Sequence, residues 1–194
     1  MEKGGLAAAL AAQRLSQATQ LYWGDEMRMG LLGQVRRRWS PRGMKVRQRV
    51  AFGRVWSYLA LVVDGIRGRL HWCWINNMKG ESIAAAVRAW QADGVEAVVW
   101  DRAGGHRAQT VRDVGMVLLE QPAGAPELNP AERVFEELRR SIEGQQYATI
   151  EDKVAAVETE LKKWAADAER IRRLAGWSWI TEAGQTLPLN IAAA

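Results

Sequence analysis

The sequence contains a single cysteine, Cys73, and this scarcity excludes two kinds of site at once. One thiol forms no intramolecular disulfide and no cysteine metal site, so we expect a protein of a reducing compartment, with the cytoplasm as the default. Long apolar runs are also missing. No stretch approaches the roughly 20 residues that span a bilayer, and the amino-terminal residues show no secretory cleavage pattern. We therefore predict no membrane partner.

Acidic residues are absent from one long segment, residues 28–54, which is rich in arginine. The whole chain carries 27 Lys and Arg against 22 Asp and Glu, a formal net charge of +5. This balance favours nucleic acid as a partner, although many soluble proteins carry such a charge without binding DNA. The position of the basic residues is more informative, because a concentrated positive field can follow a phosphate backbone. The candidate DNA-binding residues are Arg28, Arg36, Arg37, Arg38, Arg42, Lys45 and Arg47.

Tryptophan, in contrast, is abundant, with ten residues in a chain of 194. Most of them stand at strand-like or helix-core positions, so we expect core packing rather than base stacking. The tryptophans assigned to the core are Trp56, Trp72, Trp74, Trp90, Trp100 and Trp164. The length, the 48% of hydrophobic residues and the 25% of charged residues are typical of one globular domain.

The hydrophobic periodicity predicts an α/β protein with a mixed five-stranded sheet, three antiparallel strands followed by two parallel ones, flanked by helices. The predicted strands are residues 21–32, 49–63, 68–76, 95–100 and 115–121. The predicted helices are residues 82–90, 107–113, 130–142 and 150–167. We divide the chain into a helix or linker arm at residues 1–20, a main domain at residues 21–173 and a tail at residues 174–194.

Three carboxylates stand where they can face one cleft. Asp25 lies within the first predicted strand, Asp101 directly follows residues 95–100, and Glu132 lies in the first turn of a predicted helix. Cleaving or transferring a DNA phosphodiester requires stabilisation of negative charge, which two divalent ions roughly 3.5–4 Å apart supply. Mg²⁺ prefers oxygen ligands such as carboxylates. These residues are therefore candidate ligands for two Mg²⁺ ions, with Mn²⁺ as a substitute.

Each of these positions also has a purely structural explanation. The segment from Asn129 to Glu132 is a good helix start, in which the glutamate could reach back as part of a capping box. Asp101 could merely end a strand, and Asp25 could pair with an arginine. Glu26 is the rival of Asp25, because adjacent strand residues face opposite sides and one of the two enters the cleft.

The segments WGDEMRMGL, VVWDRAGGH and APELNPAERVFEELRR resemble the three signature blocks of DDE transposases of the mariner-like superfamily. They are most similar to the bacterial insertion-sequence branch, the insertion sequence 630 family, and the resemblance covers roughly residues 21–167. It implies a ribonuclease-H-like catalytic domain in which Asp25, Asp101 and Glu132 are the catalytic, metal-binding residues. It also places a histidine at His106, which we treat with Glu26 as auxiliary, although a surface turn histidine is an alternative.

The resemblance further implies metal-dependent DNA cleavage and strand transfer for an insertion sequence. The partner would be DNA, both transposon ends and target, with a homodimer assembled on it and the bacterial nucleoid as its location. Two alternatives stay open. One is another ribonuclease-H-like nuclease of the junction-resolvase type, and the other is a non-catalytic DNA-binding remnant of a transposase.

Members of this family usually carry amino-terminal helix-turn-helix modules, and in this sequence one predicted helix precedes Asp25. Base sequence is usually read by a helix in the major groove, whereas Lys and Arg contacts to phosphates position a duplex without identifying it. We therefore expect weak, sequence-independent DNA binding through the basic segment.

Overall fold

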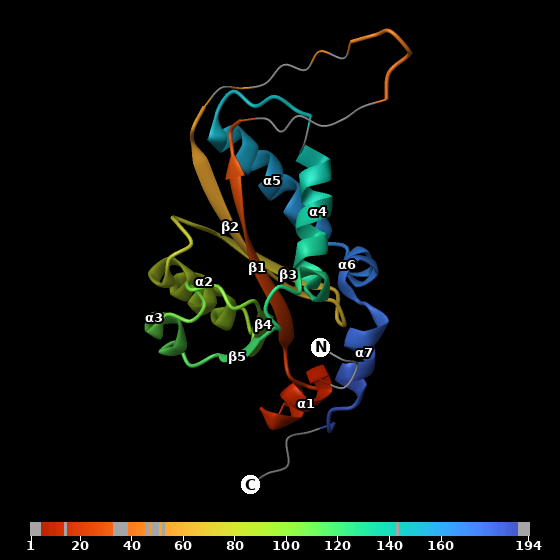
Figure 1. The fold of residues 1–194 in the computed structure, drawn as a ribbon. Coiled ribbons are helices and arrows are strands. Elements are labelled where there is room, and N and C mark those ends of the chain that lie inside the picture. Colours follow the sequence, from red (N-terminus) through yellow and green to blue (C-terminus); the bar gives the residue numbers. More distant parts are fainter. Residues whose placement is uncertain are drawn as a thin grey trace.

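A mixed five-stranded sheet forms the centre of the molecule, with helices on both faces (Figure 1). The computed structural model describes residues 5–13, 15–32, 39–45, 47, 51, 53–142 and 144–189. The strands are β1 (Leu21–Gly30), β2 (Trp56–Asp64), β3 (Arg69–Ile75), β4 (Ala97–Trp100) and β5 (Val117–Glu120), in the order β3-β2-β1-β4-β5. β1, β2 and β3 pair antiparallel, and β1, β4 and β5 pair in parallel. This confirms the predicted ribonuclease-H-like sheet.

The hairpin of β2 and β3 follows from its sequence, a run of β-branched and aromatic residues interrupted by a turn. Asp64 is fully buried at that turn, where its Oδ1 accepts hydrogen bonds from the backbone N–H groups of Ile66 and Arg67 at 2.8 and 2.9 Å. Gly68 closes the turn at φ +74°, a conformation that favours glycine. Asp64 therefore stabilises the turn between β2 and β3.

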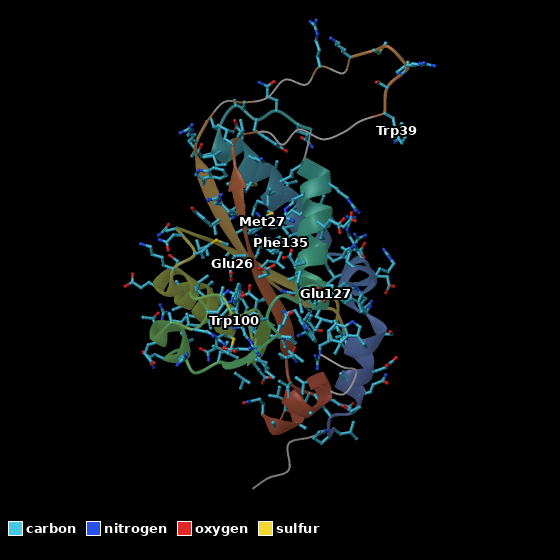
Figure 2. The ribbon with its side chains drawn as sticks, viewed as in Figure 1. Glu26, Met27, Trp39, Trp100, Glu127 and Phe135 are labelled. Atoms are coloured by element: carbon cyan, nitrogen blue, oxygen red, sulfur yellow. The ribbon has the colours of Figure 1, made fainter. Side chains whose placement is uncertain are left out.

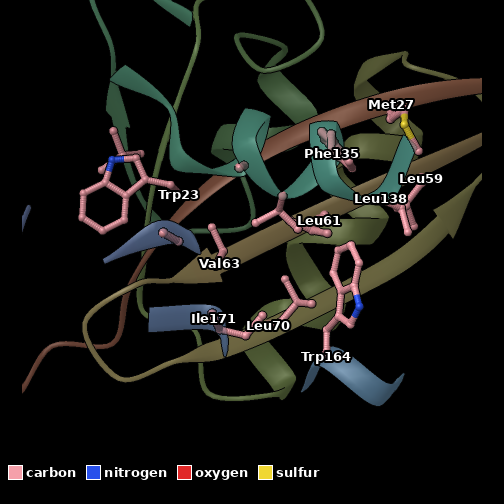
Figure 3. Packing of buried hydrophobic residues seen from close by; sticks show 14 of the residues in the cluster. Trp23, Met27, Leu59, Leu61, Val63, Leu70, Phe135, Leu138, Trp164 and Ile171 are labelled. Atoms are coloured by element: carbon pink, nitrogen blue, oxygen red, sulfur yellow. The ribbon is translucent and has the colours of Figure 1, made fainter. Parts of the chain in front are cut away.

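Alternate residues of the central strands pack on opposite faces of the sheet. On one face Tyr22 and Val62 pack against α2 (Gly80–Ala92), and the short helix α3 (Gln109–Arg112) lies beside α2. On the other face Leu59 and Leu61 pack in one cluster with residues of α4 (Pro130–Ile142) and α5 (Ile150–Ala165), as Figure 3 shows. The apolar stripe of α4, with Val134, Phe135, Leu138 and Ile142, is buried as its spacing predicts.

The carboxyl-terminal part contains two short helices, α6 (Ala168–Ala175) and α7 (Ser178–Gln185), of which α7 lies in the tail, where the sequence shows no clear period. Asp167 begins α6, because its carboxylate accepts a hydrogen bond from the Arg170 N–H at 2.9 Å. α7 lies against α1 (Gly5–Ala12), which is shorter than the predicted amino-terminal helix, and Leu10 and Leu187 are buried there. In the described part of the chain, no helix is both long enough and apolar enough to cross a bilayer.

Five of the six tryptophans assigned to the core are buried or partly buried, but Trp56 is 45% exposed. It is the first residue of β2, and it pairs with Gly30 at the far end of β1. The prediction was wrong here because periodicity identifies the face of a strand and does not show where the covering helix ends.

Candidate functional site

Asp25 and Asp101 lie at the same edge of the sheet, where β1 and β4 run parallel. The β1–β4 pairing runs from Leu21 to Trp23, so Asp25 follows shortly after the paired stretch, and Asp101 directly follows β4. Open α/β sheets bind ligands outside the carboxyl ends of such strands. Topology therefore brings together two carboxylates that are far apart in the sequence.

Glu132 reaches the same place from α4, which is held against β1 by the side chain of Asn129. The Asn129 Oδ1 accepts a hydrogen bond from the Ala131 N–H at 3.0 Å, and its Nδ2 donates one to the Gly24 carbonyl at 3.0 Å. Asn129 thus caps the helix and ties its first turn to the residue before Asp25. The buried Asn129 already performs the helix-start role that the capping explanation gave to Glu132.

The three carboxylates line one cavity of about 350 Å³. Burial, followed by the nearby charges of Glu132, Glu26 and Asp101, raises the pKa of Asp25 from its ordinary value of 3.8 to about 8. Among the described residues, no three Asp, Glu, His or Cys side chains stand close enough together to hold one ion directly. The arrangement is therefore a shared acidic cavity rather than a closed cage around a single ion.

Glu26 projects to the opposite face of β1 and contacts His106, so the structure separates the two members of the acidic pair. The His106 Nε2 lies 2.8 Å from the Glu26 Oε2, and the His106 Nδ1 lies 2.8 Å from the Asp101 Oδ1. The Glu26 and His106 side chains are 5% and 3% exposed. Glu26 and Trp100 both lie on the side of the sheet that α2 and α3 cover (Figure 2).

His106 is held in plane by Trp100, since the two rings stack with centroids 4.1 Å apart and an interplanar angle of 3°. Burial lowers the pKa of His106, but the hydrogen bond and charge of Glu26, followed by those of Asp101, outweigh burial and raise the pKa to about 9. The imidazole is therefore protonated at neutral pH, and both of its nitrogens donate to carboxylates. Gly105 makes this turn possible, because a Cβ there would lie 2.7 Å from the Met78 carbonyl oxygen.

Two residues of the cavity were not identified as candidate site residues in the sequence analysis. Arg102 lines the cavity, and its Nε donates to the Gln121 carbonyl at 2.9 Å while lying 3.4 Å from the Glu120 Oε2. Gln121 is buried, and its Nε2 has no hydrogen-bond partner among the described residues. Both follow the end of a strand, where periodicity no longer indicates a direction. Their strand-end positions, one beside Asp101, were the available signal.

The predicted DNA-binding residues are spread over a larger region than the cavity. Arg28 lies on β1, and Arg42, Lys45 and Arg47 are exposed on the segment that joins β1 to β2. Residues 39–45 of this segment lie away from the sheet, and Trp39 among them is fully exposed (Figure 2). The remaining three predicted residues, Arg36, Arg37 and Arg38, lie outside the described residues.

Comparisons with known proteins identify the family and the fold. A family model described as "DDE superfamily endonuclease" matches residues 20–153. The Mos1 strand transfer complex matches with a TM-score of 0.66 and 15% identity, over 95% of this chain and 60% of that chain. The Mos1 transposase paired-end complex with the left transposon end matches with a TM-score of 0.64 and 17% identity, over 94% of this chain and 61% of that chain.

The catalytic domain of Mos1 mariner transposase, solved alone, matches with a TM-score of 0.58 and 15% identity, over 94% of this chain and 92% of that chain. No curated protein sequence matches. At these identities the likeness to solved structures shows the fold alone, and the chain spans about 60% of the length of the proteins in the two complexes.

Proposed function

The chain belongs to the DDE superfamily of endonucleases, and from this premise we propose that it is a transposase catalytic domain that cleaves DNA in a metal-dependent reaction. We propose further that it transfers the cut strand to target DNA on behalf of an insertion sequence. The observation that carries the proposal is that Asp25, Asp101 and Glu132 line one cavity at the carboxyl ends of parallel strands. These are the residues that match the acidic positions of the family's signature blocks.

Asp25, Asp101 and Glu132 would hold two Mg²⁺ ions, with Mn²⁺ as a substitute. Their chemistry fits, because burial and like-charge repulsion raise the pKa of Asp25, and divalent cations would compensate the negative charge that causes the repulsion. Mg²⁺ is usually held by one or two carboxylates and retains several waters, so a shared cavity without a three-ligand cage suits it. When bound, the two ions supply charge stabilisation at the attacking and leaving oxygens.

Glu26 and His106 are positioning residues in this proposal. The protonated His106 donates one hydrogen bond to the Asp101 Oδ1 and one to the Glu26 Oε2. Glu26 is thus the buried counter-charge of the imidazolium. The stack with Trp100 fixes the ring plane, so that Asp101, which is itself 59% exposed, is held in one orientation. Arg102 is the cationic side chain among the described lining residues, and we assign it to a phosphate oxygen of the DNA.

The proposed partners are DNA, at the transposon end and at the target, and a second copy of the chain when both are assembled on DNA. The proposed location is the bacterial cytoplasm, in association with the nucleoid. Support comes from the family match and from the fold shared with Mos1 transposase, whose structures contain paired transposon ends and a strand transfer complex.

The test is cleavage of duplex DNA by the purified chain in Mg²⁺ or Mn²⁺, with Asp101→Asn and Glu132→Gln as variants. We expect both variants to lose cleavage while remaining folded, because Asn129, and not Glu132, caps α4. Glu127→Gln is the matched control, since Glu127 lies on the short 3-10 helix η1 (Pro126–Leu128), just before α4, and does not line the carboxylate cavity. Full activity of Glu132→Gln would refute the assignment.

The products distinguish the proposed function from the related nucleases. Joining of a DNA 3′-hydroxyl end to a second duplex is the result expected of a transposase. Cleavage of four-way junctions without joining would identify a resolvase-type nuclease. Metal-independent binding with no cleavage in either metal would identify a DNA-binding remnant.

A further inference from the structure

A second cavity, of about 370 Å³, lies between the far end of β1 and the carboxyl end of α4. Its described lining includes three cationic side chains, Arg28, Arg139 and Lys153, and no acidic one. The aromatic ring of Trp56 and the apolar side chains of neighbouring residues complete the wall. A cavity with positive groups around an exposed aromatic ring is suited to a ligand that has both a negative group and a flat ring.

Trp56 is held in place by β1 and keeps a large part of its surface open. A Cβ on Gly30 would lie 2.6 Å from the Trp56 Cζ3, so the absence of a side chain at Gly30 makes room for the ring. The Arg28 guanidinium carbon lies 4.3 Å from the ring centroid, which is a cation–π contact. These contacts fix the ring while 45% of the residue stays exposed, so a planar group could stack on the ring by taking the place of the exposed Arg28 side chain.

The cations of this cavity are placed by the fold. The Lys153 Nζ donates to the Gly30 carbonyl at 2.7 Å, and this bond ties α5 to the end of β1 beside Trp56. Arg139 stands in the last turn of α4, and Arg28 stands on β1. Guanidinium groups bind phosphate oxygens through two parallel hydrogen bonds, so two arginines beside an exposed indole match a nucleotide.

The surface of α4 connects this cavity to the carboxylates. A third cavity, of about 460 Å³, runs along the helix and shares Glu132 with the carboxylate cavity and Arg139 with the Trp56 cavity. Glu132 and Arg139 are seven residues apart on one helix, a distance of roughly 10 Å at about 1.5 Å per residue. At roughly 3.4 Å per nucleotide, the spacing of a strand that keeps its duplex stacking up to the unpaired nucleotide, this is about three nucleotides.

We propose that the Trp56 subsite, formed by Arg28, Trp56, Arg139 and Lys153, binds an unpaired nucleotide of the DNA strand about three nucleotides from the bond that is cut. The base stacks on Trp56 in place of the Arg28 guanidinium, and the adjoining phosphates pair with Arg28 and Arg139. This inference rests on the proposed function, because it takes the carboxylate cavity as the place of cleavage. Every base has an aromatic face, so the subsite selects unpaired over paired DNA and does not read sequence.

The test measures binding without cleavage. Fluorescence anisotropy in EDTA compares a labelled thymidine oligonucleotide with a duplex of equal length. We expect Trp56→Ala to weaken binding of the single strand by about tenfold, within the range measured for base–aromatic stacking, and to change duplex binding little. Trp56→Phe should retain most of the affinity. Arg28→Ala should weaken binding and flatten its salt dependence, whereas Arg88→Ala, on the exposed face of α2, should do neither.

A second measurement locates the base directly in the unmodified protein. An oligonucleotide that carries 5-iododeoxyuridine is irradiated with the parent chain, and the adduct is mapped by mass spectrometry. We expect the adduct on the peptide that contains Trp56. Adducts on other peptides alone would overturn the proposal, even if Trp56→Ala proved too unstable to study.

The outcomes separate this proposal from the proposed function. If the parent chain cleaves DNA while Trp56→Ala binds single strands as tightly as the parent, the subsite is refuted and the function stands. Equal loss of single-strand and duplex binding in Trp56→Ala would also refute it, because stacking on an unpaired base predicts a difference. A parent chain that neither binds nor cleaves DNA would refute both the subsite and the proposed function.

Discussion

Asp25 and Glu26 are neighbours on β1, yet they occupy opposite electrostatic environments. Asp25 faces other carboxylates, and burial together with their charges raises its pKa to about 8. Glu26 faces His106, a cation whose own pKa is raised to about 9 once the contacts with Glu26 and Asp101 have outweighed burial. An acid that lacks a counter-charge within the protein is ready to receive one from outside, whereas an acid that already has a partner serves the structure.

The largest expected difference between the two residues is in DNA cleavage. Asp25→Asn should reduce metal-dependent cleavage to background, because it removes a ligand. Glu26→Gln should lower it by about 10–100-fold, the range typical of groups that orient a metal ligand. Initial rates across a Mg²⁺ titration measure both effects. An active Asp25→Asn beside an inactive Glu26→Gln would show that the roles are reversed.

The next difference is in stability without metal. The pKa of Asp25 is raised from 3.8 to about 8. The contribution of its protonated form to the free energy of unfolding is therefore complete below pH 4 and is lost as the pH rises through 8. Asp25→Asn should therefore be more stable than the parent by about 1–3 kcal/mol at pH 8, with a smaller gain at pH 5. Glu26→Gln should be less stable by about 1–3 kcal/mol, because it removes the buried partner of His106.

Urea unfolding in EDTA at pH 5 and pH 8 measures these changes. Saturating Mn²⁺ should then stabilise the parent more than Asp25→Asn, since a ligand that binds the folded state shifts the unfolding equilibrium. An Asp25→Asn variant that is less stable than the parent at pH 8 would contradict the environment described for Asp25.

A smaller effect tests whether Glu26 and His106 act as one unit. In a double-mutant cycle, Glu26→Gln and His106→Ala should be coupled by about 1–2 kcal/mol in unfolding free energy, because the two side chains share a buried hydrogen bond. The same cycle with Asp25→Asn in place of Glu26→Gln should show weaker coupling. Equal coupling energies in the two cycles would contradict the pairing of His106 with Glu26 as a separate unit.

The smallest effect concerns a third carboxylate, Glu158, which contacts two neutral indoles and one cation, Lys162. Its Oε2 accepts hydrogen bonds from the Trp72 and Trp74 indoles at 2.8 and 3.1 Å. Burial raises the pKa of Glu158, but these bonds, together with the hydrogen bond and charge of Lys162, lower it overall. The contribution of the ionised Glu158 to the free energy of unfolding is therefore present above the ordinary pKa of a glutamate and is lost as the pH falls. Glu158→Gln should therefore cost about 0.5–1.5 kcal/mol at pH 7 and little in acid. Thermal unfolding at both pH values checks this, with the exposed Glu151→Gln as the control.

The sheet could be predicted from the sequence because its signals are local. The hairpin of β2 and β3 is marked by its turn, and β4 is a short apolar run that ends at Asp101. The short helices α6 and α7 were not predicted. α7 lies in a tail without a clear period, and a helix of eight residues gains its stability mainly from tertiary packing, whereas α6 has a local signal in its capping residue Asp167.

The candidate site was predictable to the extent that it depends on motifs. The three carboxylates belong to recognisable segments, and the alternation of a strand indicated that Asp25 and Glu26 face opposite sides. The contact between Glu26 and His106 was not predictable, because it joins residues 80 positions apart and depends on how the turn after β4 meets β1. The exposed Trp56 was missed for a related reason, since the covering helix belongs to another part of the chain.

The hydrogen bond from Asn129 to Gly24 has a consequence for the order in which activity arises. It spans 105 residues, and contacts of such separation form late, because the entropy of closing a long loop must be overcome first. During synthesis, β1 to β5 leave the ribosome before α4 does. A growing chain therefore exposes its basic segment well before its three carboxylates are brought together in one place.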